Sequence, residues 1–311
     1  MSETGILPIF APIAARPRLA ALIGALCIAF SGIFYRFAEV SPSTATVFRC
    51  LYGLPILALV AWLEHRRYGP LPSAVVRLSL IAGVFFAADL LSWHHAVDAV
   101  GAGLATVISN LQVLVVGLLA WMLFGERPTR AMFVAVPVTI FGAILISGVI
   151  GKGAYGANPA LGVGLGLFTA VAYSGYLLII RRGGSDLRRP AGPVALSTVA
   201  TLVTAAIFGT LSGELNPIPV LPNHFWLVAV GITSQSVGYL IISIALPRLP
   251  AALVSIILLA QPAATVLIAR ALLDETPSVP QLLGVVLLIG GIAVATAPIG
   301  RIRDRARAAL A

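Results

Sequence analysis

The chain has 311 residues, of which 59% are hydrophobic and 10% are charged, whereas soluble domains carry roughly 25% charged residues. This composition excludes a soluble domain of useful size and indicates a multi-pass membrane protein. The net charge of +9 at pH 7 would also suit a nucleic-acid-binding protein, so the positions of the basic residues decide between these two classes.

The hydrophobic pattern predicts ten transmembrane helices, because each apolar run reaches the ~20 residues that a helix needs to cross the hydrocarbon core. In chain order they cover residues 19–37, 43–63, 74–95, 101–123, 131–150, 161–180, 193–212, 224–244, 250–271 and 279–298. The first helix follows Arg16 and Arg18, but it is long and lacks a small-x-small cleavage site followed by a soluble region, so we interpret it as uncleaved. Cys27 and Cys50 lie within predicted helices and indicate neither a disulfide framework nor a metal site.

Basic residues concentrate on one side of the predicted membrane. With the N-terminus inside, sixteen of the 20 Lys and Arg residues fall in cytoplasmic segments, which is the positive-inside pattern. This predicts a protein of the cytoplasmic (inner) membrane with both termini in the cytoplasm, and it explains the positive charge without nucleic acid. The basic tail at residues 301–307 is expected to contact anionic lipid headgroups. The cytoplasmic set is Arg16, Arg18, Arg66, Arg67, Arg77, Arg127, Arg130, Arg181, Arg182, Arg188, Arg189, Arg248, Arg301, Arg303, Arg305 and Arg307.

A repeat divides the chain into two halves. The segment Leu123–Thr129, with the sequence LFGERPT, returns 149 residues later as Leu272–Ser278, with the sequence LLDETPS. This predicts two five-helix repeats, residues 1–155 and 156–311. Because five is odd, equivalent helices of the two halves cross the membrane in opposite directions. Secondary transporters are commonly built from such inverted repeats, with the ligand site between the halves near the bilayer midplane.

Polar groups are costly in hydrocarbon, so those inside predicted helices are candidates for function. On the third helix, Asp89 and Trp93 share one face near mid-membrane, and Arg49 on the second helix lies at a similar depth. Asp89 could pair with Arg49, relay protons or bind a substrate ammonium group, and we favour the structural ion pair. His94 and His95 point about 100° apart on a helix, so they cannot share a metal ion, and no metal site is predicted. One of the two histidines is expected to line a cavity.

The chain resembles the drug/metabolite transporter superfamily, and in particular its EamA-type exporters, over residues 19–298. The features that carry the resemblance are the ten helices in a five-plus-five inverted repeat, the TVFR segment ending at Arg49, and the GERP turn that starts at Gly125. The second copy of the turn departs from the pattern, with Asp274-Glu275-Thr276 in place of Gly-Glu-Arg. Within this superfamily the overall pattern is most similar to the aromatic amino acid exporters of the YddG type. The resemblance implies an all-α, basket-shaped membrane fold with a central cavity lined mainly by the third, fourth, sixth, eighth and ninth helices.

Other polar and aromatic side chains lie on the helices that the resemblance places around this cavity. Gln235 and Tyr239 share a face of the eighth helix, and Gln261 in the ninth corresponds in the repeat to Gln112 in the fourth. Any one of them could instead serve inter-helix hydrogen bonding. Together they predict a polar cavity that suits a small zwitterionic or neutral solute. The predicted substrate-binding set is Asp89, Trp93, His94, Asn110, Tyr173, Gln235, Tyr239 and Gln261.

These features predict a secondary transporter that exports small metabolites, with aromatic or hydrophobic amino acids favoured, by alternating access between the two halves. The chain carries no Walker sequence for ATP hydrolysis, and no cofactor is expected. Its expected partners are the solute and membrane lipids, and we expect a monomer. A passive facilitator or channel in the same fold and an exporter of another small neutral metabolite remain open. A membrane-embedded enzyme is disfavoured because no His/Asp/Ser constellation or metal-ligand spacing is present.

Overall fold

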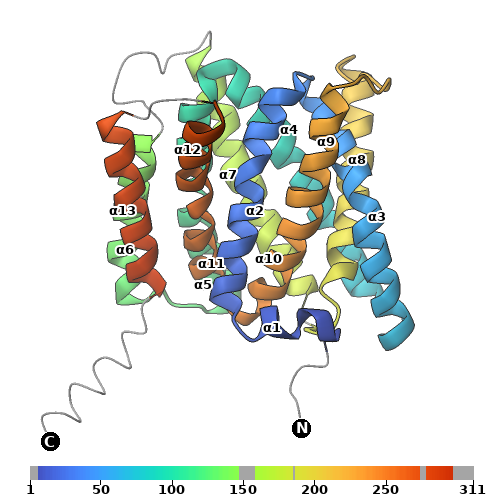
Figure 1. Ribbon diagram of the computed structural model, residues 1–311. Helices are drawn as coiled ribbons and strands as arrows, with labels where there is room; N and C mark the ends of the chain where they lie inside the picture. The colour runs from blue at the N-terminus through green and yellow to red at the C-terminus, as the bar shows by residue number, and fades with distance from the viewer. Residues whose placement is uncertain (1–5, 147–157, 185, 274–277, 297–311) are drawn as a thin grey trace, which may run out of the picture.

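The computed structural model describes residues 6–146, 158–184, 186–273 and 278–296, and within these ranges it contains helices and no strands (Figure 1). Six helices are long and apolar enough to cross a membrane, and four further apolar helices are shorter. The helices are η1 (Pro8–Phe10), α1 (Ala11–Ala14), α2 (Pro17–Ala38), α3 (Pro42–Tyr68), α4 (Ser73–Ser109), α5 (Gln112–Phe124), α6 (Arg130–Ile146), α7 (Pro159–Gly183), α8 (Ala191–Leu211), α9 (Asn223–Val230), the π-helical segment η2 (Gly231–Gly238), α10 (Tyr239–Ala245), η3 (Leu246–Arg248), α11 (Ala251–Leu258), α12 (Ala260–Leu273) and α13 (Val279–Thr296).

The short gap that we predicted between the third and fourth helices, at residues 96–100, is helical in the structure. The backbone stays helical through α4, and its α-helical hydrogen bonding is interrupted at Asn110 and Leu111. The prediction placed the gap where the hydropathy falls, at Asp98. The side chain of Asp98 is exposed, so its charge does not interrupt the backbone hydrogen bonds of the helix. The two parts of α4 nevertheless run in opposite directions along α7, because Asp89 contacts Thr169 and Ala99 contacts Asn158, whereas Ile108 packs against Gly166.

Two of the other predicted spans are helical but irregular. The ninth is divided at Leu259 into α11 and α12, and this interruption lies 149 residues after the one at Asn110. The eighth runs from α9 to α10 through eight residues of π-helix. There the Ser236 hydroxyl donates to the carbonyl oxygens of Gly231 and Gly53, at 2.8 Å each, which ties the widened turn to α3. Single π-helical turns inside α-helices are frequent at functional sites.

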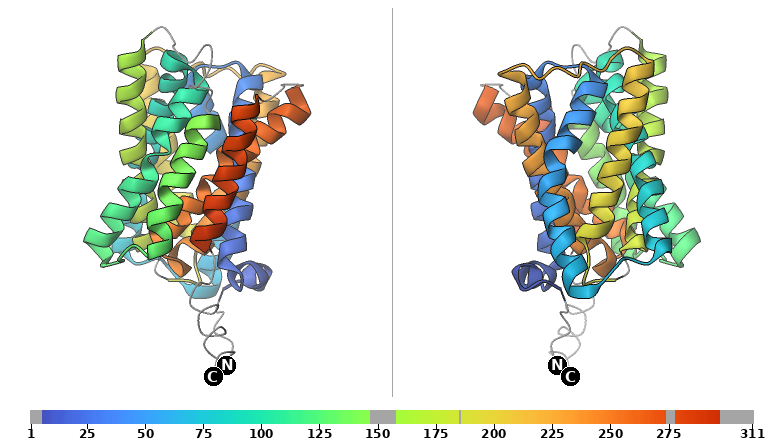
Figure 2. Two further views of the ribbon diagram at one scale, coloured as in Figure 1. Left: turned by 90° about the vertical axis from the view of Figure 1, so that its left-hand side faces the viewer. Right: turned by 90° about the vertical axis from the view of Figure 1, so that its right-hand side faces the viewer.

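Small residues let the helices pack closely where lipid supplies no hydrophobic force. A methyl group on Gly83 of α4 would lie 2.2 Å from the carbonyl oxygen of Ser197 on α8. One on Gly142 of α6 would lie 2.8 Å from the carbonyl oxygen of Gly284 on α13. Both positions therefore require glycine for the observed contact. In Figure 2, α6 and α13 stand side by side at one edge of the bundle.

The lower end of the molecule in Figure 1 holds α1, the end of α3, the start of α6 and the end of α13. Hence α6 and α13, which occupy matching places in the sequence repeat, run in opposite directions. The last turns of α3 and α7 carry Arg66, Arg67, Arg181 and Arg182.

Two glutamates fasten elements together at this lower end. Glu64, near the end of α3, is 1% exposed and accepts hydrogen bonds from the backbone N–H groups of Ala191 and Gly192, at 3.0 Å. These are the first residues of α8, so a carboxylate from one helix caps the positive end of another. Glu126, in the turn between α5 and α6, pairs with Arg181 of α7 and accepts from the N–H group of Ala251 in α11 at 2.9 Å. The turn is thereby joined to two helices of the second half.

Candidate substrate-binding site

Arg49 lies in the first third of α3 and is buried, with 4% of its surface exposed. Its Nε donates a hydrogen bond to Gln235 Oε1 at 3.1 Å. Its Nη1 donates to Ser31 Oγ at 3.3 Å, and its Nη2 donates to Ser234 Oγ at 3.2 Å. The guanidinium is thus held by α2 and the π-helical segment. All three acceptors are neutral, so they solvate the positive charge without cancelling it.

Close packing of α3 on the π-helical segment brings Gln235 beside Arg49. One turn after Arg49, a methyl group on Gly53 would lie 2.9 Å from the carbonyl oxygen of Gly231 and 3.0 Å from the Gln235 side chain. Gln235, 1% exposed, also donates from its Nε2 to Thr198 Oγ1 on α8 at 3.0 Å. Both polar atoms of this amide are therefore used within the protein. Gln235 orients Arg49 in this structure, and its predicted contact with the solute stays a prediction.

Asp89 is buried in α4, with 7% of its surface exposed, and interacts electrostatically with Arg49. The predicted direct ion pair is not formed, since no N···O contact within 4.0 Å joins these two described residues. A similar depth in the membrane does not fix lateral distance. α4 packs on α7, where Thr169 Oγ1 donates to the Asp89 carbonyl oxygen at 3.5 Å, while Arg49 extends toward α2.

Four aromatic rings form a cluster between α4, α7 and α10. Phe86 stacks on Tyr176 with a centroid distance of 4.4 Å and meets Tyr239 edge-on at 4.8 Å. Tyr173 stacks on Tyr176 at 6.0 Å and interacts with Tyr239 through their hydroxyl groups. Both Tyr173 and Tyr239 also interact electrostatically with Asp89. Phe86 was not predicted, although its place three residues before Asp89 puts it on the same helical face.

Trp93 and His94 lie farther along α4 and face α2. Trp93 is half-buried, and a methyl group on Gly32 of α2 would lie 4.0 Å from the edge of its ring. His94 is 2% exposed, and its ring lies 4.2 Å from the ring of Tyr35. Its Nδ1 has no hydrogen-bond partner in the part of the chain that the structure describes.

Asn110 and Gln261 lie at the two helix interruptions. Asn110 is half-buried in the break between α4 and α5, and Gln261 is half-buried near the start of α12. Gln112 begins α5, is 5% exposed, and its carbonyl oxygen accepts from the Ser174 hydroxyl of α7 at 3.4 Å. The structure therefore groups the predicted residues in three places. Asp89, Tyr173, Gln235 and Tyr239 are central, Trp93 and His94 lie between α4 and α2, and Asn110 and Gln261 lie at the interruptions.

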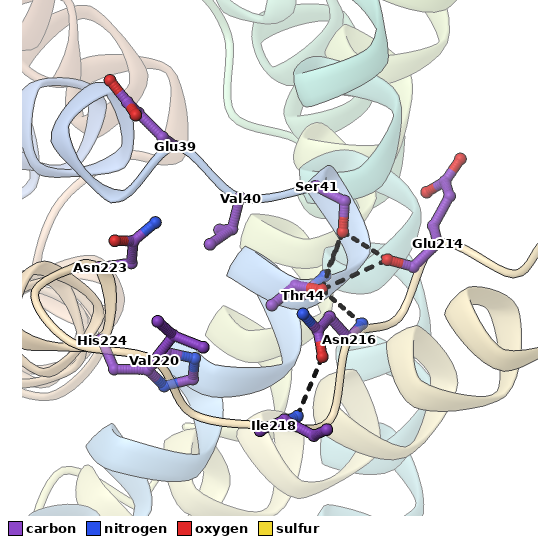
Figure 3. Close-up of a pocket in the computed structure, with 10 residues that line it drawn as sticks. All are labelled: Glu39, Val40, Ser41, Thr44, Glu214, Asn216, Ile218, Val220, Asn223 and His224. Atoms are coloured by element: carbon purple, nitrogen blue, oxygen red, sulfur yellow. Dashed lines mark hydrogen bonds between the residues drawn. The ribbon is translucent and has the colours of Figure 1, made fainter.

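A pocket of about 330 Å³ opens at the opposite end of the molecule from the basic helix ends, where α3 begins and α9 follows its loop (Figure 3). Ser41 Oγ donates to the Glu214 carbonyl oxygen at 2.5 Å, and the Asn216 N–H donates to Thr44 Oγ1 at 2.9 Å. In Figure 3 the side chain of Glu39 lies at the rim and points outward. The residues that line the pocket are Glu39, Val40, Ser41, Thr44, Glu214, Asn216, Ile218, Val220, Asn223 and His224. Sequence patterns did not predict this pocket, because it is built largely from loop residues.

The Glu214 carboxylate fastens the loop before α9 to the first half of the chain. It accepts a hydrogen bond from Ser43 Oγ at 2.8 Å and lies 3.4 Å from His95 Nε2. His95 therefore faces Glu214, whereas His94, the preceding residue on α4, faces α2. Among the residues that the structure describes, no group of three or more His, Cys, Asp or Glu side chains is arranged to hold a metal ion.

The model of the EamA-like transporter family matches the chain twice, over residues 16–148 and 160–297. The chain belongs to the EamA-like transporter family. This confirms the predicted resemblance to EamA-type members of the drug/metabolite transporter superfamily, and with it a multi-pass membrane protein of the transporter class. The narrower resemblance to aromatic amino acid exporters stays a prediction.

Two relatives agree with this assignment, and a solved structure shares the fold. The chain is 23% identical over 265 residues to the uncharacterized transporter sll1319 of Synechocystis sp., covering 79% of this chain and 77% of that protein. It is 24% identical over 268 residues to the uncharacterized transporter YwfM of Bacillus subtilis, covering 83% and 86% of the two chains. A protein crystal structure superposes with a TM-score of 0.77 at 20% identity, covering 91% of this chain and 96% of the other, and shows a shared fold.

Proposed function

We propose that this EamA-family transporter exports small zwitterionic or neutral metabolites, with aromatic or hydrophobic amino acids as the favoured solutes. The observation that carries the proposal is the centre of the bundle. There a buried cation, a buried carboxyl group and the cluster of Phe86, Tyr173, Tyr176 and Tyr239 come together. Aromatic rings favour aromatic and cationic solutes through stacking and cation–π contacts. Because Arg49 is the one cation at this depth in the described helices, a strongly anionic solute is disfavoured.

We further propose that transport occurs by alternating access between two inverted five-helix repeats. Three observations support this arrangement. The family model matches each half separately, the helix interruptions at Asn110 and Leu259 lie one repeat apart, and the equivalent helices α6 and α13 run in opposite directions (Figure 1). Interrupted helices near a pseudo-symmetric centre are typical of the solute sites of secondary transporters.

The same proposal places the protein in the inner membrane, with the lower end of Figure 1 in the cytoplasm. The basic last turns of α3 and α7 at that end support this orientation. The proposed partners are the solute and membrane lipids, and the proposed functional unit is a monomer.

Uptake into proteoliposomes across a panel of amino acids, with and without a pH gradient, tests the proposal. We expect uptake of phenylalanine and tryptophan to exceed that of glycine and threonine. Equal uptake of all amino acids would contradict the aromatic preference, and uptake of other neutral metabolites alone would favour the alternative solute class. Stimulation by a pH gradient would indicate proton coupling, whereas uptake that follows only the solute gradient would favour a passive facilitator.

A further inference from the structure

The pocket shown in Figure 3, called the outer pocket from here on, lies between the two halves of the chain. Ser41 and Thr44 on one wall belong to the first half, whereas Asn216 and His224 on the other belong to the second. Its volume of about 330 Å³ is at the lower end of the range for small-molecule sites, which suits a solute the size of one amino acid. The outer pocket therefore lies where a solute that passes between the halves leaves the protein.

His224 offers the outer pocket a nitrogen that the protein does not use. The residue is 5% exposed, and its Nδ1 lies 2.8 Å from the hydroxyl oxygen of Tyr52. Its Nε2 makes no hydrogen bond to any residue that the structure describes. Buried polar groups in proteins are nearly always hydrogen-bonded, so this nitrogen calls for a partner. Since His224 lines the pocket, an occupant can supply that partner.

The contact with Tyr52 makes Nε2 a hydrogen-bond donor. Nδ1 of His224 is the one partner of the Tyr52 hydroxyl group among the described residues, so the hydroxyl proton is satisfied when Tyr52 donates to Nδ1. The imidazole proton then lies on Nε2, and a protonated ring also carries a proton there. His224 belongs to the first turn of α9, at the positive end of that helix. A donor in this position favours a carboxylate.

Tyr52 also connects the outer pocket to the buried cation. It lies three residues after Arg49 on α3, and a methyl group on Gly231 of the π-helical segment would lie 2.9 Å from its Cβ atom. The helix α9, which carries His224, continues directly into the same segment. The outer pocket and Arg49 are thus joined by the same two elements, and a solute bound in the pocket is one step farther out than the centre of the bundle.

We propose that the outer pocket is a release site that binds the carboxylate group of the exported amino acid. The carboxylate accepts a hydrogen bond from His224 Nε2. Glu39 lies at the rim, so a zwitterion, whose ammonium group can face the rim, is favoured over a plain anion (Figure 3). This inference rests on the proposed function and adds a second solute site to it. The rival occupant is water, which bonds to Nε2 without recognising a solute.

Protection of a cysteine in the outer pocket tests the release site in the purified full-length protein. Ile218 lines the pocket and is 67% exposed, so Ile218→Cys, with Cys27 and Cys50 replaced by alanine, reports occupancy through its rate of thiol labelling. We expect phenylalanine at about ten times its dissociation constant to slow the labelling about tenfold, because only the unoccupied pocket reacts. At the same concentration 3-phenylpropionate, which keeps the carboxylate, should protect to a lesser degree, whereas phenethylamine, which lacks the carboxylate, should not protect.

Substitutions separate the carboxylate contact from folding and from the central site. His224→Leu should raise the phenylalanine concentration for half protection about tenfold or more, and His224→Gln, whose amide can donate in place of Nε2, should restore part of the protection. Tyr239→Leu, in the aromatic cluster, should leave the protection unchanged. If His224→Leu does not fold, the comparison of His224→Gln with the wild-type side chain takes its place. Unchanged protection in His224→Leu, or an equal loss in both His224 variants, would remove His224 from the site.

Leu221→Cys is the matched control, because Leu221 is 79% exposed in the same loop and does not line the outer pocket. Its labelling should not respond to any of the three compounds. Equal protection of both cysteines, protection by phenethylamine equal to that by phenylalanine, or no protection by phenylalanine would each overturn the release site. If the protein takes up phenylalanine into proteoliposomes while Ile218→Cys stays unprotected, the release site alone fails, whereas no uptake of any amino acid refutes the proposed function itself.

Discussion

At the scale of single residues, the arrangement around Arg49 determines how a charge is kept inside the bundle. Burying a guanidinium without hydrogen-bond acceptors is very costly, and three neutral acceptors from two elements reduce that cost. Because none of them carries a negative charge, the field of Arg49 still reaches Asp89 and the tyrosine hydroxyl of Tyr239. The positive charge of Arg49 is therefore not neutralised by a direct ion pair.

Gln235→Leu should lower the stability of the protein, because it leaves one donor of the buried Arg49 without an acceptor. We expect a loss of about 1–3 kcal/mol, measured as a drop in the midpoint of thermal unfolding in detergent. Thr233→Val, in the same π-helical segment but bonded only to the Ala229 carbonyl oxygen, is the matched control and should change stability less. Equal melting temperatures for wild type and Gln235→Leu would show that the amide does not support the guanidinium.

Tyr239→Leu should reduce transport of aromatic solutes more than transport of small ones. The ring of Tyr239 contacts the rings of Phe86 and Tyr176. Removing an aromatic contact with the solute costs ~0.5–2 kcal/mol of binding free energy, which lowers the affinity by up to about thirtyfold. Competitive uptake of phenylalanine against threonine measures the difference, with membrane abundance checked for each variant. Trp93→Leu is predicted to act in the same direction. If both variants lose phenylalanine and threonine uptake equally, the aromatic residues serve folding or gating.

At the scale of elements, irregular helices are the features that hydropathy misses. The predicted second helix, residues 43–63, lies within α3, and the seventh, residues 193–212, agrees with α8 to within two residues at each end, because the thickness of the hydrocarbon sets their lengths. The interruption before α5 escaped prediction because Leu111 is apolar and its backbone keeps right-handed helical dihedral angles. Contacts between helices could not be predicted either. The positions of Gln235 beside Arg49 and of Phe86 in the aromatic cluster depend on lateral packing, which helical periodicity does not contain.

Glu64→Gln should weaken the junction of α3 and α8. The carboxylate accepts from two backbone N–H groups at the start of α8, and its charge interacts favourably with that end of the helix. We expect a stability loss of about 1–2 kcal/mol in thermal unfolding, comparable to the loss of a good N-cap. Glu39→Gln is the control, since Glu39 is an exposed acid at the end of α2. A similar small effect of both substitutions would contradict a capping role for Glu64.

At the scale of the whole molecule, the fold is fastened at both ends between the two halves of the chain. Glu126 joins the turn after α5 to α7 and α11 at the lower end, and Glu214 joins the loop before α9 to α3 and α4 at the upper end. A carrier that works by alternating access must release such contacts in turn. The contacts of Glu126 and Glu214 are therefore the ones that we expect to change between the two conformations.

The orientation of the bundle can be measured in cells by cysteine labelling. In a background with Cys27 and Cys50 replaced by alanine, Asn158→Cys and Asn216→Cys should react with an impermeant thiol reagent added outside. Ser73→Cys, at the start of α4, should react only after the membrane is opened. All three native side chains are exposed, so access depends on the side of the membrane. Labelling of Ser73→Cys in intact cells would contradict cytoplasmic placement of the lower end.

Counterflow in proteoliposomes tests the central claim most directly, namely that this EamA-family protein is a carrier for aromatic amino acids. Vesicles loaded with unlabelled phenylalanine are diluted into a trace of labelled phenylalanine, with threonine-loaded and empty vesicles as controls. We predict that the label accumulates transiently above its external concentration in phenylalanine-loaded vesicles and less in threonine-loaded ones. Equilibration of the label without overshoot under every loading condition would show an open pore or no recognition of the solute, and would contradict the claim.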